Sequence, residues 1–217
     1  MQKTGKQASN GRNYFQYNWE PEFTCDFEER IGPMGDGGKW LCNAYKIAHA
    51  ENCNVLSIGS NNDFSFEDAM HKLNPRCKIH TFDHTVLTPK APAYVNFHSV
   101  GLGSQSSGNI RTMKDIMDIA GFQGKDVDVL KIDCEGCEYD VYKQFFTGFI
   151  RQILIEIHYN GKPWKDLGEN KIRESTDALM QSMHDHGFTI FHKEPNTYGC
   201  GGDCIEYAFL KTNFTDP

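Results

Sequence analysis

Two apolar segments that end abruptly in small and acidic residues constrain the fold of this chain most. The first is NVLSIGSNND at 54–63, and the second is VDVLKIDCEGCEYDVY at 127–142. A buried parallel strand has this composition where it leaves a sheet and opens into a ligand crevice. The intervening chain is long enough for further strands with crossover connections. The two segments therefore predict one parallel sheet with a glycine turn and an acidic turn on the same edge.

Hydrophobic patterning along the rest of the chain predicts the other elements. Strands are expected at 54–58, 78–82, 94–100, 127–132, 150–157, 188–192 and 205–210. Helices are expected at 39–50, 64–73, 112–119, 139–146 and 172–186. The last two strands follow each other without a helix, which suggests an antiparallel pair. The predicted fold class is α/β: a Rossmann-like, doubly wound sheet of seven strands, mostly parallel, with a C-terminal antiparallel hairpin.

The beginning of the chain is polar and shows no period, so we expect a flexible N-terminal extension over 1–27. Glycines and prolines over 21–38 predict a loop. The remaining residues, 28–213, then form one domain, which is ordinary for a chain of 217 residues.

Charge and hydropathy exclude some classes of protein. The net charge is −7 and no basic stripe occurs, which argues against a nucleic-acid partner. No apolar run approaches the roughly 20 residues that span a bilayer. The first residues lack the apolar core of a signal peptide, so the chain as it stands is expected to be cytoplasmic.

Eight cysteines leave three interpretations open. Buried free thiols used as small apolar side chains are the first. Disulfides are the second, with Cys25–Cys42 and Cys200–Cys204 as the nearest pairs, and they would place the protein in the secretory lumen. Zinc bound by the C-x-x-C at 134–137 and by the Cys200/Cys204 pair is the third.

The glycine turn and the end of the second strand are candidates for a nucleoside-type cofactor. Gly59 allows a sharp turn close to a ligand, and Ser60 and Asn61 follow with polar groups and the first N–H groups of a helix. Asp83 ends the second strand, where a carboxylate can accept both ribose hydroxyls. The alternatives are an ordinary strand-to-helix turn and an aspartate that caps its own turn.

The acidic turn and the end of the fifth strand are candidates for catalysis. Asp133 and Glu135 follow the fourth strand, and His158 follows the fifth. A histidine titrates near neutral pH and could accept a proton from a substrate hydroxyl or amine. A histidine at this position could also be a purely structural hydrogen-bonding group. A divalent metal on these three residues is an alternative that we do not favour.

Several motifs in sequence order resemble a known family. They are VLSIGSNND, HTFD, VGLGS, DVLKIDCEGCEYDVY and ILIEIHY. Their order and spacing are similar to those of class I S-adenosylmethionine-dependent methyltransferases, and most of all to the FkbM-type group and related methyltransferase-like domain proteins. The phrase LKIDCEGCE resembles the LKID-x-EG-x-E signature of that group. The resemblance covers residues 28–211.

The resemblance implies a sheet of strand order 3-2-1-4-5-7-6 and S-adenosylmethionine as cofactor, with S-adenosylhomocysteine as product. The turn at 59–61 would face the methionine part, Asp83 the ribose, and Gly101 and Leu102 the adenine. Asp133 would lie between cofactor and acceptor. The first motif has one glycine where many methyltransferases have two or three.

The activity implied is methyl transfer to a small molecule (EC 2.1.1), most simply O-methylation of a hydroxyl on a sugar or metabolite. N-methylation of a small amine and a non-catalytic binding protein with the same fold are the alternatives. A nicotinamide-dependent oxidoreductase is disfavoured because G-x-G-x-x-G is missing. The loops at 28–40, 84–93, 159–170 and 194–203 are expected to shape the acceptor side. The oligomeric state is left open.

Overall fold

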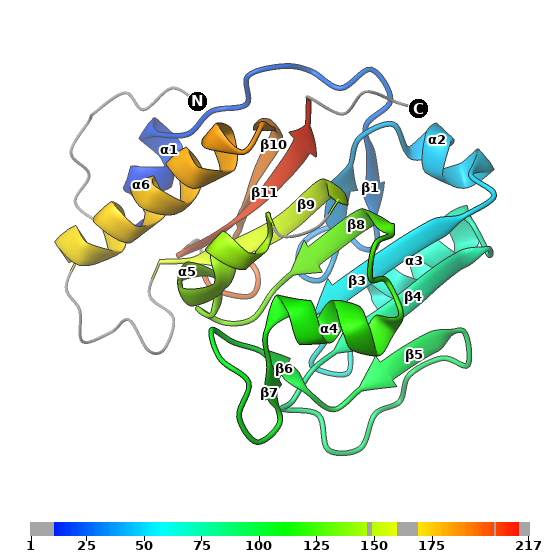
Figure 1. The fold of residues 1–217 in the computed structure, drawn as a ribbon. Coiled ribbons are helices and arrows are strands. Elements are labelled where there is room, and N and C mark those ends of the chain that lie inside the picture. The colour runs from blue at the N-terminus through cyan, green and yellow to red at the C-terminus, as the bar shows by residue number, and fades with distance from the viewer. Residues whose placement is uncertain (1–10, 147–148, 160–168, 202, 213–217) are drawn as a thin grey trace.

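The fold is built on one seven-stranded sheet. The computed structural model describes residues 11–146, 149–159, 169–201 and 203–212. The strands of the sheet are β3 (Cys53–Ile58), β4 (Cys77–Phe82), β5 (Val95–His98), β8 (Asp126–Ile132), β9 (Phe149–His158), β10 (Phe188–Asn196) and β11 (Cys204–Lys211). The predicted α/β class and the mostly parallel sheet are confirmed (Figure 1).

The strand order in space is β10-β11-β9-β8-β3-β4-β5. Numbered along the chain, it is the expected order 3-2-1-4-5-7-6 read from the other edge. Strand β3 is parallel to both of its neighbours, β4 and β8, whereas β11 runs antiparallel to β9 and β10. The chain leaves β3 toward β4 and later returns to the other side at β8. The topological switch point, where open α/β sheets bind ligands, therefore lies between β3 and β8.

Helices and one small hairpin cover the two faces of the sheet (Figure 1). One hydrophobic cluster joins the sheet to α1 (Gly11–Tyr17), α4 (Met113–Ala120), α5 (Glu138–Val141), the 3-10 turn η1 (Tyr142–Gln144) and α6 (Glu169–Asp185). A second cluster joins it to β1 (Glu29–Ile31), β2 (Lys39–Leu41), α2 (Ala44–His49) and α3 (Ser65–Leu73). Strand β8 contributes to both clusters, which explains its nearly continuous apolar sequence.

The N-terminal segment is not a flexible extension over its described part. Tyr14 and Phe15 are 2% exposed and Trp19 is 4% exposed, because α1 packs on the sheet beside β11. The ring of Phe15 makes edge contacts with Tyr159 and Tyr207. A few large aromatic side chains bury enough area to fix a segment that is otherwise polar. Residues 1–10 lie outside the described residues.

The helix expected over 39–50 is also wrong in its first part. Residues 39–41 form strand β2, which pairs antiparallel with β1, and the helix begins only at Ala44. Lys39 and Leu41 are buried and Trp40 is half-buried, so the pattern has the period of a strand. The hairpin also places β1 within residues expected to form a loop. Asn43, at φ 52°, separates the strand from the helix.

Two further expected elements are shorter than predicted. The third strand ends at His98, and the chain then forms β6 (Gly101–Leu102), which pairs with β7 (Ile110–Arg111). The helix expected at 139–146 is only α5 followed by η1. Local periodicity does not register such short pairings and helix ends.

All eight cysteines form disulfides. The expected pairs Cys25–Cys42 and Cys200–Cys204 are confirmed, and the structure adds Cys53–Cys77 and Cys134–Cys137. The interpretation as buried free thiols, and that of a zinc site on four thiolates, are therefore wrong. Cys53–Cys77 joins the first residues of β3 and β4, and Cys134–Cys137 closes the turn after β8. No helix in the described part of the chain has the length and apolar content to span a bilayer.

We expect none of the eight cysteines to react with a thiol reagent in the denatured, unreduced protein. Replacing Cys25 and Cys42 by alanine should lower the free energy of unfolding by about 3 kcal/mol, because the disulfide closes a loop of intermediate length. The matched variant C134A/C137A removes a disulfide that closes a much shorter loop, so its loss of unfolding free energy should be about half as large. Urea denaturation measures both, and eight reactive thiols would contradict the pairing.

Candidate functional site

A cavity of about 910 Å³ opens at the switch point. Its volume is in the range of small-molecule and cofactor sites. The residues expected at the cofactor and catalytic sites all line it: Gly59, Ser60, Asn61, Asp83, Gly101, Leu102, Asp133, Glu135 and His158. Three of the loops expected on the acceptor side also contribute to the lining, whereas residues 160–168 of the fourth lie outside the described residues. The structure thus brings the residues predicted at the cofactor and catalytic sites together around one cavity.

Gly59 is required by a contact between two backbones. Its φ is +84°, and a Cβ at this position would lie 1.7 Å from the carbonyl oxygen of Asp133. The N–H of Asp133 donates to the carbonyl of Ile58 at 2.9 Å, so the turns after β3 and β8 touch. No other residue fits here, because any Cβ would overlap the neighbouring chain.

Asp83 joins the turn after β3 to the turn after β4. Its Oδ2 accepts from the backbone N–H groups of Ser60 and Asn61, each at 2.8 Å. Its Oδ1 accepts from the N–H of Thr85 at 2.8 Å and from the Thr85 hydroxyl at 2.6 Å. Burial by itself raises the pKa of Asp83, but these hydrogen bonds lower it below its usual value. Asp83 therefore caps its own turn, which was the alternative to a role in cofactor binding. Ribose hydroxyls would have to share the oxygens of its carboxylate with these backbone and side-chain donors.

Part of the cavity wall is apolar. Phe82 is fully buried and Leu102 is 5% exposed, and both line the cavity. A Cβ on Gly101 would lie 2.3 Å from Nδ1 of His84, so this glycine allows the imidazole to approach the backbone closely. A planar aromatic group fits against such a wall.

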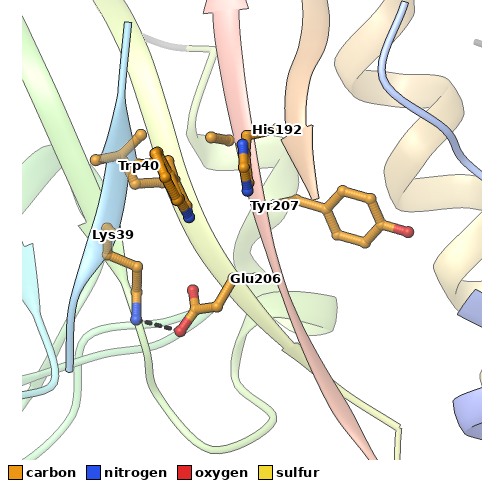
Figure 2. Close-up of a pocket in the computed structure, with 7 residues that line it drawn as sticks. Lys39, Trp40, His192, Glu206 and Tyr207 are labelled. Atoms are coloured by element: carbon orange, nitrogen blue, oxygen red, sulfur yellow. Dashed lines mark hydrogen bonds and ion pairs between the residues drawn. The ribbon is translucent and has the colours of Figure 1, made fainter. Parts of the chain in front are cut away.

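A buried ion cluster that the sequence did not predict adjoins the cavity, and two of its members, Asp133 and Glu156, line it. Nζ of Lys39 lies 2.5 Å from Oε1 of Glu206, 3.6 Å from Oδ2 of Asp133 and 3.9 Å from Oε2 of Glu156. Figure 2 shows Lys39 of β2 directed at Glu206 of β11, beside the stacked rings of Trp40 and His192. One ammonium group thus faces three carboxylates.

The cluster sets different protonation states for its carboxylates. Burial by itself raises the pKa of Asp133, but Lys39, Lys131 and His158 together lower it below its usual value. Burial and the neighbouring carboxylates Asp133 and Glu206 raise the pKa of Glu156 to about 9. At neutral pH, Asp133 is therefore ionised and Glu156 carries a proton.

His158, at the end of β9, has its two ring nitrogens in different surroundings. Nδ1 lies 3.0 Å from Oε1 of Glu138, whereas Nε2 lies 3.5 Å from Oε2 of Glu135 and 4.0 Å from Oδ1 of Asp133. Burial by itself lowers the pKa of His158, but Glu138, Glu156 and Asp133 raise it to about 9. The expectation that His158 titrates near neutral pH is therefore wrong, and its ring is charged at pH 7.

Two further polar residues at the cavity were also missed. Nδ2 of Asn196 donates to Oδ1 of Asp36 at 3.2 Å and to Oε1 of Glu156 at 3.0 Å. Asn196 is the last residue of β10, and Asp36 lies in the β1–β2 turn. The only sequence signal was that both lie in loops expected at the acceptor side.

Asp133, Glu135 and His158 bring potential metal-binding atoms within 4.8 Å of one another. The other two such sets among the described residues rely on sulfurs that form disulfides. We do not assign the first set to a metal. Asp133 is paired with Lys39, and the raised pKa of His158 keeps its ring protonated at neutral pH.

The sheet order and the cavity at its switch point define the class I S-adenosylmethionine-dependent methyltransferase fold. A family described as "Methyltransferase domain" matches residues 2–211. The chain therefore belongs to this methyltransferase family. No curated protein sequence matches it.

The structure is also similar to solved structures of low sequence identity. A putative hemolysin from Streptococcus thermophilus aligns with a TM-score of 0.52 and 13% identity, over 75% of this chain and 60% of that one. A fibrillarin pre-rRNA processing protein from Methanococcus jannaschii aligns with a TM-score of 0.48 and 10% identity, over 74% of this chain and 67% of that one. The N-methyltransferase NodS from Bradyrhizobium japonicum, in complex with S-adenosyl-L-homocysteine, aligns with a TM-score of 0.42 and 10% identity, over 78% of this chain and 84% of that one. Likeness at such identities extends to the fold alone.

Replacing Lys39 by methionine should lower the free energy of unfolding by about 3–5 kcal/mol, because buried carboxylates lose their cation. The double variant K39M/E206Q should recover part of this loss. Lys114→Met removes an exposed lysine from a surface pair and should change stability by less than about 0.5 kcal/mol. Denaturant titration at pH 7 measures all three, and equal effects of K39M and K114M would contradict the account.

Proposed function

We propose that this methyltransferase uses S-adenosylmethionine to methylate a hydroxyl of a small-molecule acceptor, such as a sugar or a metabolite (EC 2.1.1). The observation that carries the proposal is the shared cavity. The glycine turn, Asp83, the apolar residues Phe82 and Leu102 and the acidic residues of the turn after β8 all line it. A nucleoside cofactor and a second molecule would therefore meet inside one enclosure.

The lining fits the parts of the proposed cofactor. Phe82 and Leu102 suit the adenine, Asp83 the ribose, and Ser60 and Asn61 the methionine part. When bound, the sulfonium supplies an activated methyl group, so the protein chiefly has to position the acceptor. The carboxylate wall beside it favours a positively charged sulfonium over a neutral thioether.

His158 is the proposed base, with Asp133 and Glu135 beside it. The hydroxyl proton of the acceptor would pass to Nε2 of His158 while the oxygen takes the methyl group and the C–S bond breaks. The ring must first lose its own proton, and a positive charge in the cavity lowers a histidine pKa. Methyl transfer should therefore accelerate as the pH rises toward about 9, where His158 becomes neutral.

The charge of the lining narrows the class of acceptor. The acidic side chains of Asp36, Asp63, Asp133 and Glu135 line the cavity, and Glu156, which also lines it, carries a proton at neutral pH. Lys131, also in the lining, donates to the carbonyl of Gly59. Phosphorylated acceptors, including nucleic acids, would meet like charge and are disfavoured. A neutral polyol fits this lining. A small ammonium compound fits it too, so N-methylation is the second candidate.

The disulfides bear on where the protein works. Structural disulfides persist in oxidising compartments and are rare in the cytosol. We therefore infer that the chain acts in the secretory lumen or outside the cell, in place of the cytoplasmic location first expected.

Calorimetric titration with S-adenosylhomocysteine, with NAD in parallel, tests the proposal. Micromolar binding of the first and none of the second is expected. Binding of NAD alone would contradict the cofactor. Binding of S-adenosylhomocysteine without methyl transfer to any polyol or amine tried would instead favour the non-catalytic binding protein.

Alanine at Asp83 and alanine at His158 should separate binding from chemistry. D83A should weaken S-adenosylhomocysteine binding by about 10- to 100-fold, because hydrogen bonds to a charged group are lost. H158A should leave that affinity within about threefold and lower the rate of methyl transfer by about 100-fold or more. Calorimetry and a labelled-methyl assay measure the two effects, with circular dichroism as a check of folding. Parent-like behaviour of both variants would refute the assignments.

A further inference from the structure

Glu138 is a fully buried carboxylate beneath the candidate site. It is the first residue of α5 and is 0% exposed. A buried carboxylate is unfavourable unless its oxygens are satisfied by donors, so the partners of Glu138 indicate its role.

The two oxygens of Glu138 serve two different segments. Oε1 accepts from the backbone N–H of His158 at 2.8 Å and lies 3.0 Å from its Nδ1. Oε2 accepts from the N–H of Gly136 at 2.9 Å and lies 3.4 Å from Sγ of Cys134. One carboxylate therefore ties the end of β9 to the turn after β8.

That turn is held in shape by its own covalent and backbone restraints. The Cys134–Cys137 disulfide closes it, Glu135 has φ 56° and Gly136 has φ 109°. The left-handed backbone at Gly136 suits glycine. The N–H of Gly136 is thus directed at Glu138, and the carboxylate is held independently of His158.

The contact determines which ring nitrogen of His158 can exchange a proton with a substrate. An acceptor at Nδ1 keeps the proton on Nδ1, so the neutral ring has its lone pair on Nε2. Nε2 is the atom that faces Glu135 and Asp133, both of which line the cavity. The orientation needed for a base is therefore imposed by a residue behind the ring.

We propose that Glu138 is a positioning residue that fixes the His158 ring and its tautomer, so that Nε2 is the proton-accepting atom of the methyl-transfer site. The inference rests on the proposed function, because His158 is the base only if the cavity carries out methyl transfer.

Other charged groups also act on His158 and must be separated from Glu138. Asp133 and Glu135 approach Nε2 from the turn after β8, and Glu156 lies on the same strand, β9. Lys39 on β2 and Lys131 on β8 act on the ring indirectly, through Asp133. Of the charged side chains in the described residues, Glu138 is the one that contacts Nδ1 of His158. The tautomer of the ring therefore reports on Glu138 specifically.

Nitrogen-15 NMR of the imidazole rings tests the proposal in the full chain. H158Q identifies the His158 signals among those of nine histidines. In the parent, His158 should titrate near pH 9 and carry its proton on Nδ1 when neutral. In Glu138→Gln, the titration midpoint should fall by about one unit or more, because the charge beside Nδ1 is removed. The rising limb of the pH–rate profile should move to lower pH by the same amount. In Glu138→Met, which has no oxygen to accept from Nδ1–H, the Nδ1–H preference should be lost.

Asp140→Asn is the matched control, because it removes the same charge from an exposed position of the same helix. It should leave both the His158 titration and the tautomer as in the parent. Glu138→Asp keeps the charge and should retain more of the high midpoint than Glu138→Gln.

A neutral parent ring with its proton on Nε2 would overturn the proposal, and so would the same titration in E138Q as in the parent. If E138Q fails to fold, the tautomer of the parent decides alone. The ring measurement does not depend on the cofactor. Failure of S-adenosylhomocysteine to bind would overturn the proposed function, and with it the catalytic meaning of the inference, whatever the tautomer.

Discussion

The contact between Gly59 and the carbonyl of Asp133 is the constraint on which the site depends. In a parallel sheet that grows on both sides of its first strand, the connections after two neighbouring strands diverge at the switch point and leave a crevice between them. Here the turns touch, because Gly59 has no Cβ to keep them apart. The close approach places the Asp83-capped turn and the acidic turn at the edge of one cavity.

Electrostatic interactions then determine which side chains around this cavity carry a proton. Lys39 arrives from a hairpin outside the sheet and keeps Asp133 ionised, while Glu156 stays protonated. His158 is held charged by the carboxylates around it, Glu138 among them. The cavity therefore combines a fixed negative wall with one histidine that can lose a proton, which suits a cationic cofactor and an acceptor that must be deprotonated.

Much of this could be predicted from the sequence, because buried parallel strands are continuous apolar runs and their ends hold the polar residues. Gly59, Asp83 and His158 were accessible in this way, whereas the strand order was implied by the resemblance to class I methyltransferases. The roles of Lys39 and Glu138 could not be predicted, because their partners, Glu206 and His158, are distant in sequence and the sequence does not show that these charges are buried. Tyr14 was missed for a related reason: isolated aromatics in a polar segment form no periodic pattern.

The most direct test of the account is a crystal structure with S-adenosylhomocysteine bound. We predict that the adenine lies against Leu102 and that the ribose hydroxyls contact Asp83. The thioether sulfur should lie between Gly59 and the acidic end of the cavity, with Nε2 of His158 on its far side. A ligand bound outside this cavity, or one inside it with the sulfur directed away from Asp133 and His158, would contradict the central claim.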